Sequence, residues 1–287
     1  MAISPGFGDI PRNFSSYKDS KIVILPVTYD GTSTWLKGAD KGPEAIIKAS
    51  WNMYLYDTET DSEVYKHGIY TDETITEDQS PEKMVQAVKE RVSGHLNNNK
   101  FIVTIGGEHS VSIGAAYAYS SFYHDKNISV LQFDAHADLQ EEYNGSKYNH
   151  ACTMSRIKEV CPIVQVGLRS MDSFEKSRTN PENAFFAENI YNNNKWIDSV
   201  IEKLTDTVYI TIDVDVFDIS IMPATGTPEP GGLLWYDVLE LLRRVVTKKN
   251  IIGFDVVELC PNEFSKPYDF MTAKLIYKLL SYIFTKK

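Results

Sequence analysis

The sequence predicts an α/β protein in which helices cover a mostly parallel central sheet. Two observations support this fold class. Short apolar runs rich in β-branched residues recur along the chain, and their near-continuous hydrophobicity suits strands that are buried on both faces. Longer segments with apolar residues at helical spacing separate these runs, and such alternation implies right-handed crossovers between parallel strands. A chain of 287 residues is long enough to bury one large core.

The expected strands follow directly from the apolar runs. The strong candidates are residues 22–27, 101–105, 128–133, 163–166, 208–212 and 251–256, and the weaker ones are 68–70 and 184–186. Helices are expected at 81–97, 194–204, 235–246 and 269–284. Ser80 stands just before Pro81, where it is placed to cap the first of these helices.

Composition excludes several classes of partner. The net charge is −10, which repels a polyanion, so we expect no nucleic-acid partner. The sequence contains no uninterrupted apolar run of about 18 residues, so no membrane span is predicted. Residues 1–12 lack the basic-then-apolar pattern of a signal peptide, so we expect a cytoplasmic protein. The three cysteines, Cys152, Cys161 and Cys260, form no CxxC pair and are expected to be buried, unpaired thiols.

Three polar runs stand at the ends of expected strands. Since ligand sites in open parallel sheets gather beyond the carboxyl ends of the strands, these runs are where chemistry is expected. They are Gly106-Gly107-Glu108-His109-Ser110, Asp134-Ala135-His136-Ala137-Asp138 and Asp213-Val214-Asp215.

The residue types in these runs favour a pair of divalent cations. If strand alternation persists, Asp134, His136 and Asp138 project to one side, as do Asp213 and Asp215. Clustered carboxylates at a buried strand end are unfavourable unless cations neutralise them. Aspartate with histidine and no cysteine suits Mn²⁺ better than a soft ion. Two such ions about 3.5–4 Å apart share one hydroxide, which leaves an anionic site receptive to a guanidinium cation.

Each run taken alone has an ordinary interpretation. Asp-x-His-x-Asp can be a hydrogen-bonded strand terminus, and Gly-Gly-Glu-His-Ser can be a turn. The segment from Asp213 to Asp218 has the look of a calcium loop, but Phe217 occupies the third ligand position. The occurrence of all three runs at expected strand ends favours the metal hypothesis.

Taken together, the motifs resemble the ureohydrolase family, which includes arginase and agmatinase, with agmatinase the most similar. The resemblance is carried by the three runs above and by His150-Ala151, the extension of the third run to Asp218, Thr225-Gly226-Thr227-Pro228-Glu229-Pro230-Gly231-Gly232 and Asp255-Val256-Val257-Glu258. These pieces occur in the family's order and span almost the whole chain. The resemblance implies an arginase-like fold, with residues 1–287 forming a single three-layer α/β/α domain.

The resemblance also implies a binuclear manganese centre with two Mn²⁺ per chain. His109, Asp134, Asp138 and Asp213 would hold one ion; Asp134, His136, Asp213 and Asp215 would hold the other, with Asp134 and Asp213 bridging. Asp138 would orient the hydroxide and pass on its proton, His150 would shuttle a proton to the leaving amine, and Glu258 would pair with the substrate guanidinium.

The chain departs from the family pattern in three places. Ile219-Ser220 stands where Pro-Ala is usual, Ala224 replaces a common glycine, and Gln140 stands where arginine is expected. The first change alters a loop near the site, and the last one bears on substrate specificity.

The expected reaction is hydrolysis of agmatine to putrescine and urea. Glu141 and Glu142 border the expected metals and would suit agmatine's distal ammonium, although solvated loop charges are an equal interpretation. Arg169 would favour an acidic substrate if it reached the pocket, but a surface or interface ion pair is the expected role. His67, His95 and His124 are expected to be structural or exposed.

Other functions remain open from the sequence. Guanidinobutyrate, guanidinopropionate, arginine or formiminoglutamate are alternative substrates. A metal-dependent deacetylase usually uses one Zn²⁺, and His136 and Asp215, the second-metal ligands, argue against it. A non-catalytic protein on the same fold is disfavoured because every ligand position is filled. Homo-oligomers, trimers or hexamers, are expected from the resemblance.

Overall fold

One eight-stranded sheet forms the centre of the protein, and every strand pairing in it is parallel. The structure, a computed structural model, describes residues 5–191, 193 and 195–285. The strands are β1 (Ile22–Val27), β2 (Ile69–Thr71), β3 (Phe101–Gly106), β4 (Ile128–Phe133), β5 (Ile163–Leu168), β6 (Ala184–Phe186), β7 (Thr207–Asp213) and β8 (Asn250–Val257). All eight expected strands, including the two weak candidates, are therefore confirmed.

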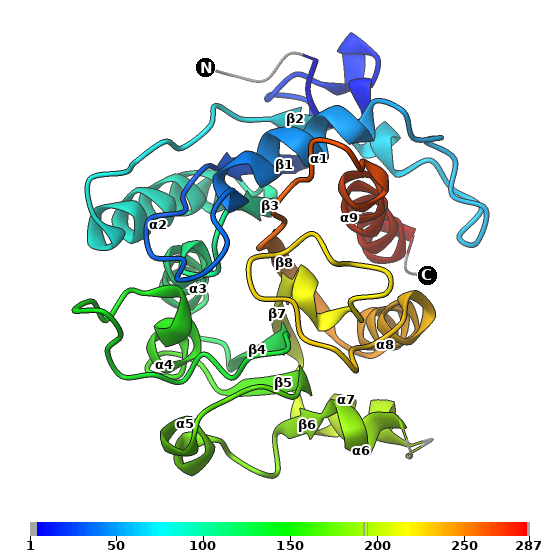
Figure 1. Cartoon of the computed structure of the whole chain (residues 1–287). Coiled ribbons are helices and arrows are strands. Elements are labelled where there is room, and N and C mark those ends of the chain that lie inside the picture. Colours follow the sequence, from blue (N-terminus) through cyan, green and yellow to red (C-terminus); the bar gives the residue numbers. More distant parts are fainter. Residues whose placement is uncertain (1–4, 192, 194, 286–287) are drawn as a thin grey trace.

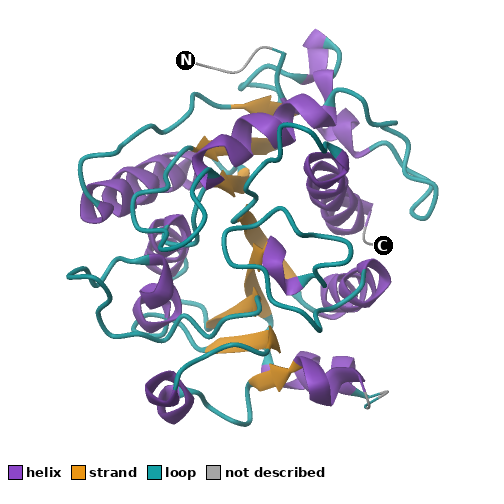
Figure 2. Ribbon diagram, viewed as in Figure 1, coloured by secondary structure: helices purple, strands orange, loops and turns teal. Residues whose placement is uncertain are grey.

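Helices cover both faces of this sheet, which makes the fold three-layered as expected (Figures 1 and 2). One face carries α2 (Pro81–Asn97), α3 (Val111–Phe122), α4 (Thr153–Ile157) and α5 (Ser173–Arg178). The other carries α6 (Ala187–Tyr191), α7 (Trp196–Lys203), α8 (Trp235–Lys248) and α9 (Pro267–Thr285), and α1 (Gly42–Ser50) packs against α9. Short 3-10 turns occupy Phe7–Asp9, Arg12–Phe14, Ala39–Lys41, Val64–His67, His150–Cys152 and Val214–Val216.

The four expected helices are present with small shifts at their ends. Ser80 caps α2 by accepting from the Lys83 backbone N–H, as the sequence predicts. α7 begins at Trp196, and the predicted start at Asn194 lies outside the described residues. The sequence reading missed α1, α3, α4, α5 and α6. In α3 the apolar residues surround the helix rather than forming a stripe, because eight of its residues are buried.

The apolar core lies in two clusters, one on each face of the sheet. One contains Ile24, Phe133 and Ile212 with side chains of α8 and α9. The other contains Leu25, Val130 and Tyr209 with side chains of α2 and α3. Burial on both faces explains the near-continuous hydrophobicity of the strands, since removal of apolar surface from water is the main driving force for folding.

The order of the strands places the polar runs side by side. The sheet runs β2-β1-β3-β8-β7-β4-β5-β6, so β8 and β7 fill the gap between β3 and β4. In a parallel sheet all carboxyl ends meet at one edge, and ligands bind where the strand order reverses. The segments after β3, β8, β7 and β4 therefore converge, although they are spread over residues 107 to 258 of the sequence.

No helix within the described ranges is both long and apolar enough to span a membrane. Cys152 and Cys161 are buried free thiols, as expected, and Cys260 is a half-buried free thiol. Of the three histidines expected to be structural or exposed, His67 packs on the Phe284 ring and His124 is exposed to solvent.

The remaining one, His95, belongs to a polar cluster that fastens α2 to the edge of the sheet. Asp72, just after β2, accepts from Arg91 at 2.8 Å and lies 2.8 Å from Nε2 of His95. Tyr17 contacts the other ring nitrogen at 3.0 Å. Burial opposes ionisation of Asp72, but the His95 and Arg91 contacts outweigh it and lower the pKa of Asp72 to about 2.

This cluster predicts an acid-dependent loss of stability. Because the folded pKa of Asp72 lies below its ordinary value of 3.8, its contribution is present above about pH 4 and is lost as the pH falls toward 2. Asp72→Asn should lower the free energy of unfolding by roughly 1–2 kcal/mol at pH 7. Urea unfolding of wild type and variant at pH 7 and pH 3 measures this, with exposed Asp125→Asn as the control. A difference equally large at both pH values would contradict it.

Candidate metal centre and substrate cavity

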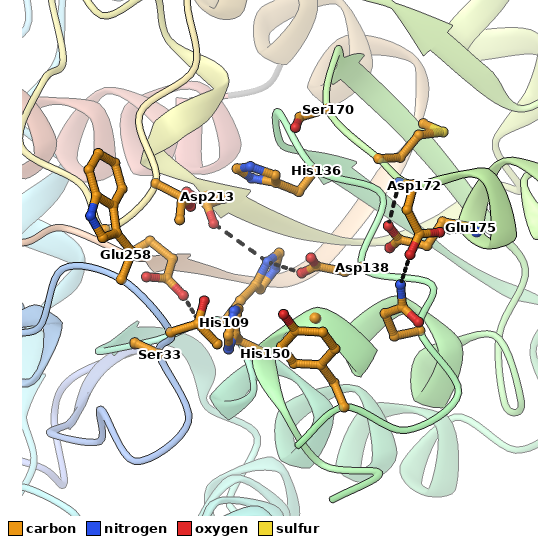
Figure 3. A pocket seen from close by; sticks show the side chains of 18 of the residues that line it. Ser33, His109, His136, Asp138, His150, Ser170, Asp172, Glu175, Asp213 and Glu258 are labelled. Carbon is orange, nitrogen blue, oxygen red and sulfur yellow. Dashed lines mark hydrogen bonds and ion pairs between the residues drawn. The ribbon is translucent and has the colours of Figure 1, made fainter. Parts of the chain in front are cut away.

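Six predicted ligand residues converge at the carboxyl edge of the sheet. His109 follows β3, Asp213 ends β7, and Asp134, His136 and Asp138 follow β4. Asp215 lies in the short turn after β7. Figure 3 shows His109, His136, Asp138 and Asp213 facing a common space. All but His136 are buried, so this is a cluster of acidic groups largely withdrawn from water.

The first group gathers around His109. Its Nδ1 lies 3.0 Å from Asp134, 3.0 Å from Asp138 and 3.7 Å from Asp213. His109, Asp134 and Asp213 each offer a ligand atom within 4.8 Å of the others. This spacing suits one divalent cation.

A second group shares Asp134. Nδ1 of His136 lies 2.8 Å from Asp215 and 3.6 Å from Asp134, and these three residues form the other set of close ligand atoms. One oxygen of Asp134 faces each histidine, which fits its predicted bridging role. Asp213 belongs to the first set only, so its predicted bridging role stays a prediction.

The convergence does not arise from strand alternation, and this part of the sequence prediction is wrong. β4 ends at Phe133, before the Asp-x-His-x-Asp run, and Asp138 adopts a left-handed backbone with φ 53°. After β7 the chain turns at once, because Asp213 accepts from the Asp215 backbone N–H at 2.8 Å. Turns held by aspartate side chains, not extended backbone, aim these ligands.

The surroundings of His109 test whether a metal fits. Its Nε2 lies 2.9 Å from the Thr211 hydroxyl, which donates to Asp255 at 2.6 Å. Since that hydroxyl's hydrogen is used, Nε2 must be the protonated nitrogen, which leaves Nδ1 as a bare lone pair in the neutral ring. Nδ1 is buried without a hydrogen-bond partner among the described residues. A lone pair facing three carboxylates calls for a cation, and metal-bound histidines are oriented in this way.

Electrostatics supports the same conclusion. Burial alone would lower the pKa of His109, but Asp134 and Asp138 outweigh burial and raise it well above the ordinary value. Burial and the charge of Asp134 raise the pKa of Asp138 to about 7. Burial, Asp215 and Asp134 raise the pKa of Asp213. These carboxylates and histidines therefore require added positive charge, which either protons or metal ions can supply.

A cavity of about 330 Å³ opens beside this cluster. His109, His136, Asp138 and Asp213 line it, and so do two other predicted site residues, His150 and Glu258. Figure 3 places Glu258 on one side of the cluster and Asp172 with Glu175 on the other. The cavity therefore has an acidic group at each end.

Glu258 is held in place at the inner end. It follows β8, has a left-handed φ of 65°, and donates its backbone N–H to Gly107 at 2.7 Å. Its Oε1 accepts from the His109 backbone N–H at 2.7 Å, while Oε2 has no hydrogen bond among the described residues. Burial and the charge of Glu108 raise the pKa of Glu258 well above the ordinary value. A cationic ligand there would favour its ionised form.

His150 also lines the cavity, and its ring is constrained by two neighbours. Its Nδ1 lies 3.3 Å from the Thr32 hydroxyl, and the Tyr143 ring packs edge-on at 6.4 Å between centroids. Burial, followed by the charges of His109 and His136, lowers the pKa of His150 to about 4. A neutral imidazole accepts a proton before it can donate one, which is what a shuttle requires.

The structure does not bring Glu141 and Glu142 to the cavity. Glu141 forms ion pairs with Arg156 at 2.6 Å and Arg178 at 2.7 Å, and neither glutamate is among the lining residues. These arginines, on α4 and α5, satisfy Glu141 as part of a structural contact. Neither glutamate therefore lines the cavity in which a substrate ammonium was predicted to meet them.

Two other predicted positions have clear structural roles. Arg169 donates to the backbone carbonyls of Asp215, Glu229 and Pro230, and it forms no ion pair among the described residues. The expected surface ion pair is not formed within the described residues, because the guanidinium ties loops together, and an ion pair at a subunit interface stays a prediction. The Ile219-Ser220 loop is fixed by Asp218, which accepts from the Ser220, Gly231 and Gly232 backbones.

The sequence prediction missed two acidic groups at the end of the cavity opposite Glu258, which we call the outer end. Asp172 and Glu175 line the cavity and form a capping box at the start of α5. The Asp-x-x-Glu spacing before a helix was the available signal. Gln140, a predicted departure from the family pattern, donates to Asp172 at 2.5 Å. The pKa of Asp172 is held below the ordinary value by the backbone N–H group of Glu175, the Gln140 side chain and the backbone N–H group of Phe174. An anionic group therefore faces the end of the cavity opposite Glu258.

Comparison with known proteins identifies the family. Residues 20–285 match the model of the Arginase family. The chain belongs to the arginase family. It is 36% identical to the N(1)-aminopropylagmatine ureohydrolase of Synechocystis sp. across 93% of this chain and 90% of that protein. It is 37% identical to the enzyme of the same name from Thermus thermophilus across 86% of this chain and 85% of that protein.

Solved structures of arginase-family proteins share the fold. The agmatine ureohydrolase of Thermoplasma volcanium superposes with a TM-score of 0.85 at 28% identity, covering 94% of this chain and 92% of that one. Membership in the arginase family makes the chain a hydrolase acting on guanidino C–N bonds.

The geometry predicts that the Asp/His cluster is the metal site. His109→Ala and Asp213→Asn should each weaken metal binding by more than the roughly 10–100-fold lost with a ligand's hydrogen-bond partner. Metal content after equilibration with Mn²⁺ and dialysis measures this. His124→Ala, which changes an exposed histidine, is the control and should keep wild-type content. Full metal content in either ligand variant would refute the site.

Proposed function

We propose that this arginase-family hydrolase is a binuclear manganese enzyme that converts agmatine to putrescine and urea. The observation that carries the proposal is the cavity itself. It joins a cluster of buried Asp and His ligands and the Glu258 carboxylate to a second acidic group, Asp172. A substrate with a guanidinium at one end and an ammonium at the other matches this arrangement of charge.

The chain's residues divide the chemistry among them. Two bound Mn²⁺ ions would supply a water of lowered pKa as the nucleophile. Glu258 accepts hydrogen bonds from the guanidinium and sets its plane. Asp138 receives the proton of the attacking water, and His150 carries a proton to the nitrogen of the leaving amine. Proton transfer by a positioned side chain typically contributes about 10²–10⁴-fold.

The outer end of the cavity selects among guanidino compounds. Asp172 presents a carboxylate there, and Arg169 uses its guanidinium on backbone carbonyls instead of the cavity. A substrate that ends in a carboxylate would meet like charge at Asp172. This argues against guanidinobutyrate, guanidinopropionate, arginine and formiminoglutamate, which carry a carboxylate.

A second candidate substrate is N(1)-aminopropylagmatine, which would yield spermidine and urea. Two relatives of this chain at 36% and 37% identity bear the name N(1)-aminopropylagmatine ureohydrolase. Its extra ammonium also suits the acidic Asp172 end of the cavity, and its longer tail could contact Trp35 and Leu36, which line the cavity and are exposed. Both candidates share the guanidinium head and the cationic tail.

A substrate panel tests the proposal. Protein loaded with Mn²⁺ should release urea from agmatine or aminopropylagmatine with a kcat/KM far above that for arginine or guanidinobutyrate. The higher of the two kcat/KM values decides between the cationic substrates. A clear preference for a carboxylate-bearing guanidino compound would reject both.

Removal of the outer charge should change affinity for the cationic tail. Asn caps a helix as well as Asp does, so Asp172→Asn keeps the start of α5 and removes only the charge. Because Asp172 is exposed, KM for agmatine should rise only about two- to fivefold, with kcat little changed. Butylguanidine, which has no tail ammonium, is the matched control, and its KM should not move. An equal rise for both substrates would contradict a charge-based role.

A further inference from the structure

A buried carboxylate that the proposed chemistry does not use, Glu108, binds the backbone of Thr32 and Ser33 at the wall of the cavity. Glu108 is fully buried, and five donors converge on it. Its Oε2 accepts from the backbone N–H groups of Thr32 at 2.6 Å and Ser33 at 2.8 Å. Its Oε1 accepts from the hydroxyls of Thr32 and Ser110, each at 2.5 Å.

One glycine makes this contact possible. A Cβ on Gly107 would lie 2.0 Å from the Tyr29 carbonyl oxygen. Only glycine lets the end of β3 approach the segment after β1 so closely. Glu108 then donates its backbone N–H to Tyr29 and reaches the loop with its side chain.

The Thr32 hydroxyl connects Glu108 to His150. Its oxygen accepts from the His150 backbone N–H at 3.0 Å and lies 3.3 Å from Nδ1 of the same residue. A hydroxyl has one hydrogen to donate and two lone pairs to accept with. Burial raises the pKa of Glu108, and the hydrogen bonds from Ser110 and Thr32 oppose this rise. With these donors holding Glu108 as a carboxylate, the short contact uses the Thr32 hydrogen, because two acceptors 2.5 Å apart would repel each other.

The donor count then determines the state of the imidazole. With its hydrogen given to Glu108, Thr32 can only accept from Nδ1, so Nδ1 must carry the proton. We propose that Thr32, held by Glu108, is a positioning residue that fixes His150 as the Nδ1–H tautomer and leaves Nε2 as the nitrogen that moves the proton. This inference rests on the proposed function only for the role of His150; the tautomer itself follows from the hydrogen bonds.

Two variants separate the hydroxyl from the shape of the side chain. Thr32→Val keeps the volume and removes the hydroxyl, while Thr32→Ser keeps the hydroxyl. Thr32→Val should lower kcat by about tenfold or more, within the range of general acid–base effects, with metal content unchanged. KM should change by less than about twofold, because the substrate contacts remain. Thr32→Ser should restore most of kcat.

A spectroscopic measurement tests the tautomer without any substrate. In ¹⁵N-histidine-labelled protein loaded with diamagnetic Mg²⁺, the signal that disappears in His150→Asn identifies His150. Wild type and Thr32→Ser should show a protonated Nδ1 and an unprotonated Nε2, and Thr32→Val should lose this state.

The outcomes distinguish the two proposals. A protonated Nε2 in wild type overturns the positioning role, whether or not Thr32→Val folds. An unchanged kcat in Thr32→Val, or an equal loss in Thr32→Ser, also overturns it. If wild type releases urea from no guanidino compound, the proposed function fails, while the tautomer measurement still decides the inference drawn from Thr32.

Discussion

The site is governed by one electrostatic constraint: five carboxylates lie buried within reach of one another. Asp134, Asp138, Asp213, Asp215 and Glu258 are each at most 8% exposed, and like charges removed from water strongly disfavour one another. Such a cluster persists only with positive charge inside it. The two histidines, the proposed metal ions and the proposed cationic substrate would each supply positive charge to this cluster. The fold must also hold the carboxylates close together and rigidly in place.

That rigidity comes from a layer of hydrogen bonds outside the ligands. Thr211 and Asp255 determine which nitrogen of His109 faces the acids, and Thr32 with Glu108 does the equivalent for His150. Both arrangements place a threonine hydroxyl between a carboxylate and an imidazole. Since a hydroxyl can donate only one hydrogen, the carboxylate sets the tautomer of the ring on the other side.

Much of the fold was predictable because strands that are buried on both faces of a sheet are almost continuously apolar and rich in β-branched residues. The clustering of the proposed ligand residues was predictable because their motifs stand at strand ends. The features that the sequence did not predict are local ones. α3 has no polar face to create a helical stripe, and the turns at Asp138 and Asp213 replace the expected extended backbone. Glu141 resembled a substrate contact because sequence cannot reveal that two arginines from α4 and α5 already pair with it.

The strand order has a consequence for how the protein is made. Until β7 and β8 leave the ribosome, β1–β3 and β4–β6 are separate three-stranded pieces, each with an unpaired inner edge at β3 or β4. Open edges of this kind invite pairing with other chains. β7 pairs with β4, and β8 pairs with β3, so these two strands close both inner edges. The same part of the chain supplies Asp213, Asp215 and Glu258, so the strands that protect the edges also bring in the last of the proposed site residues.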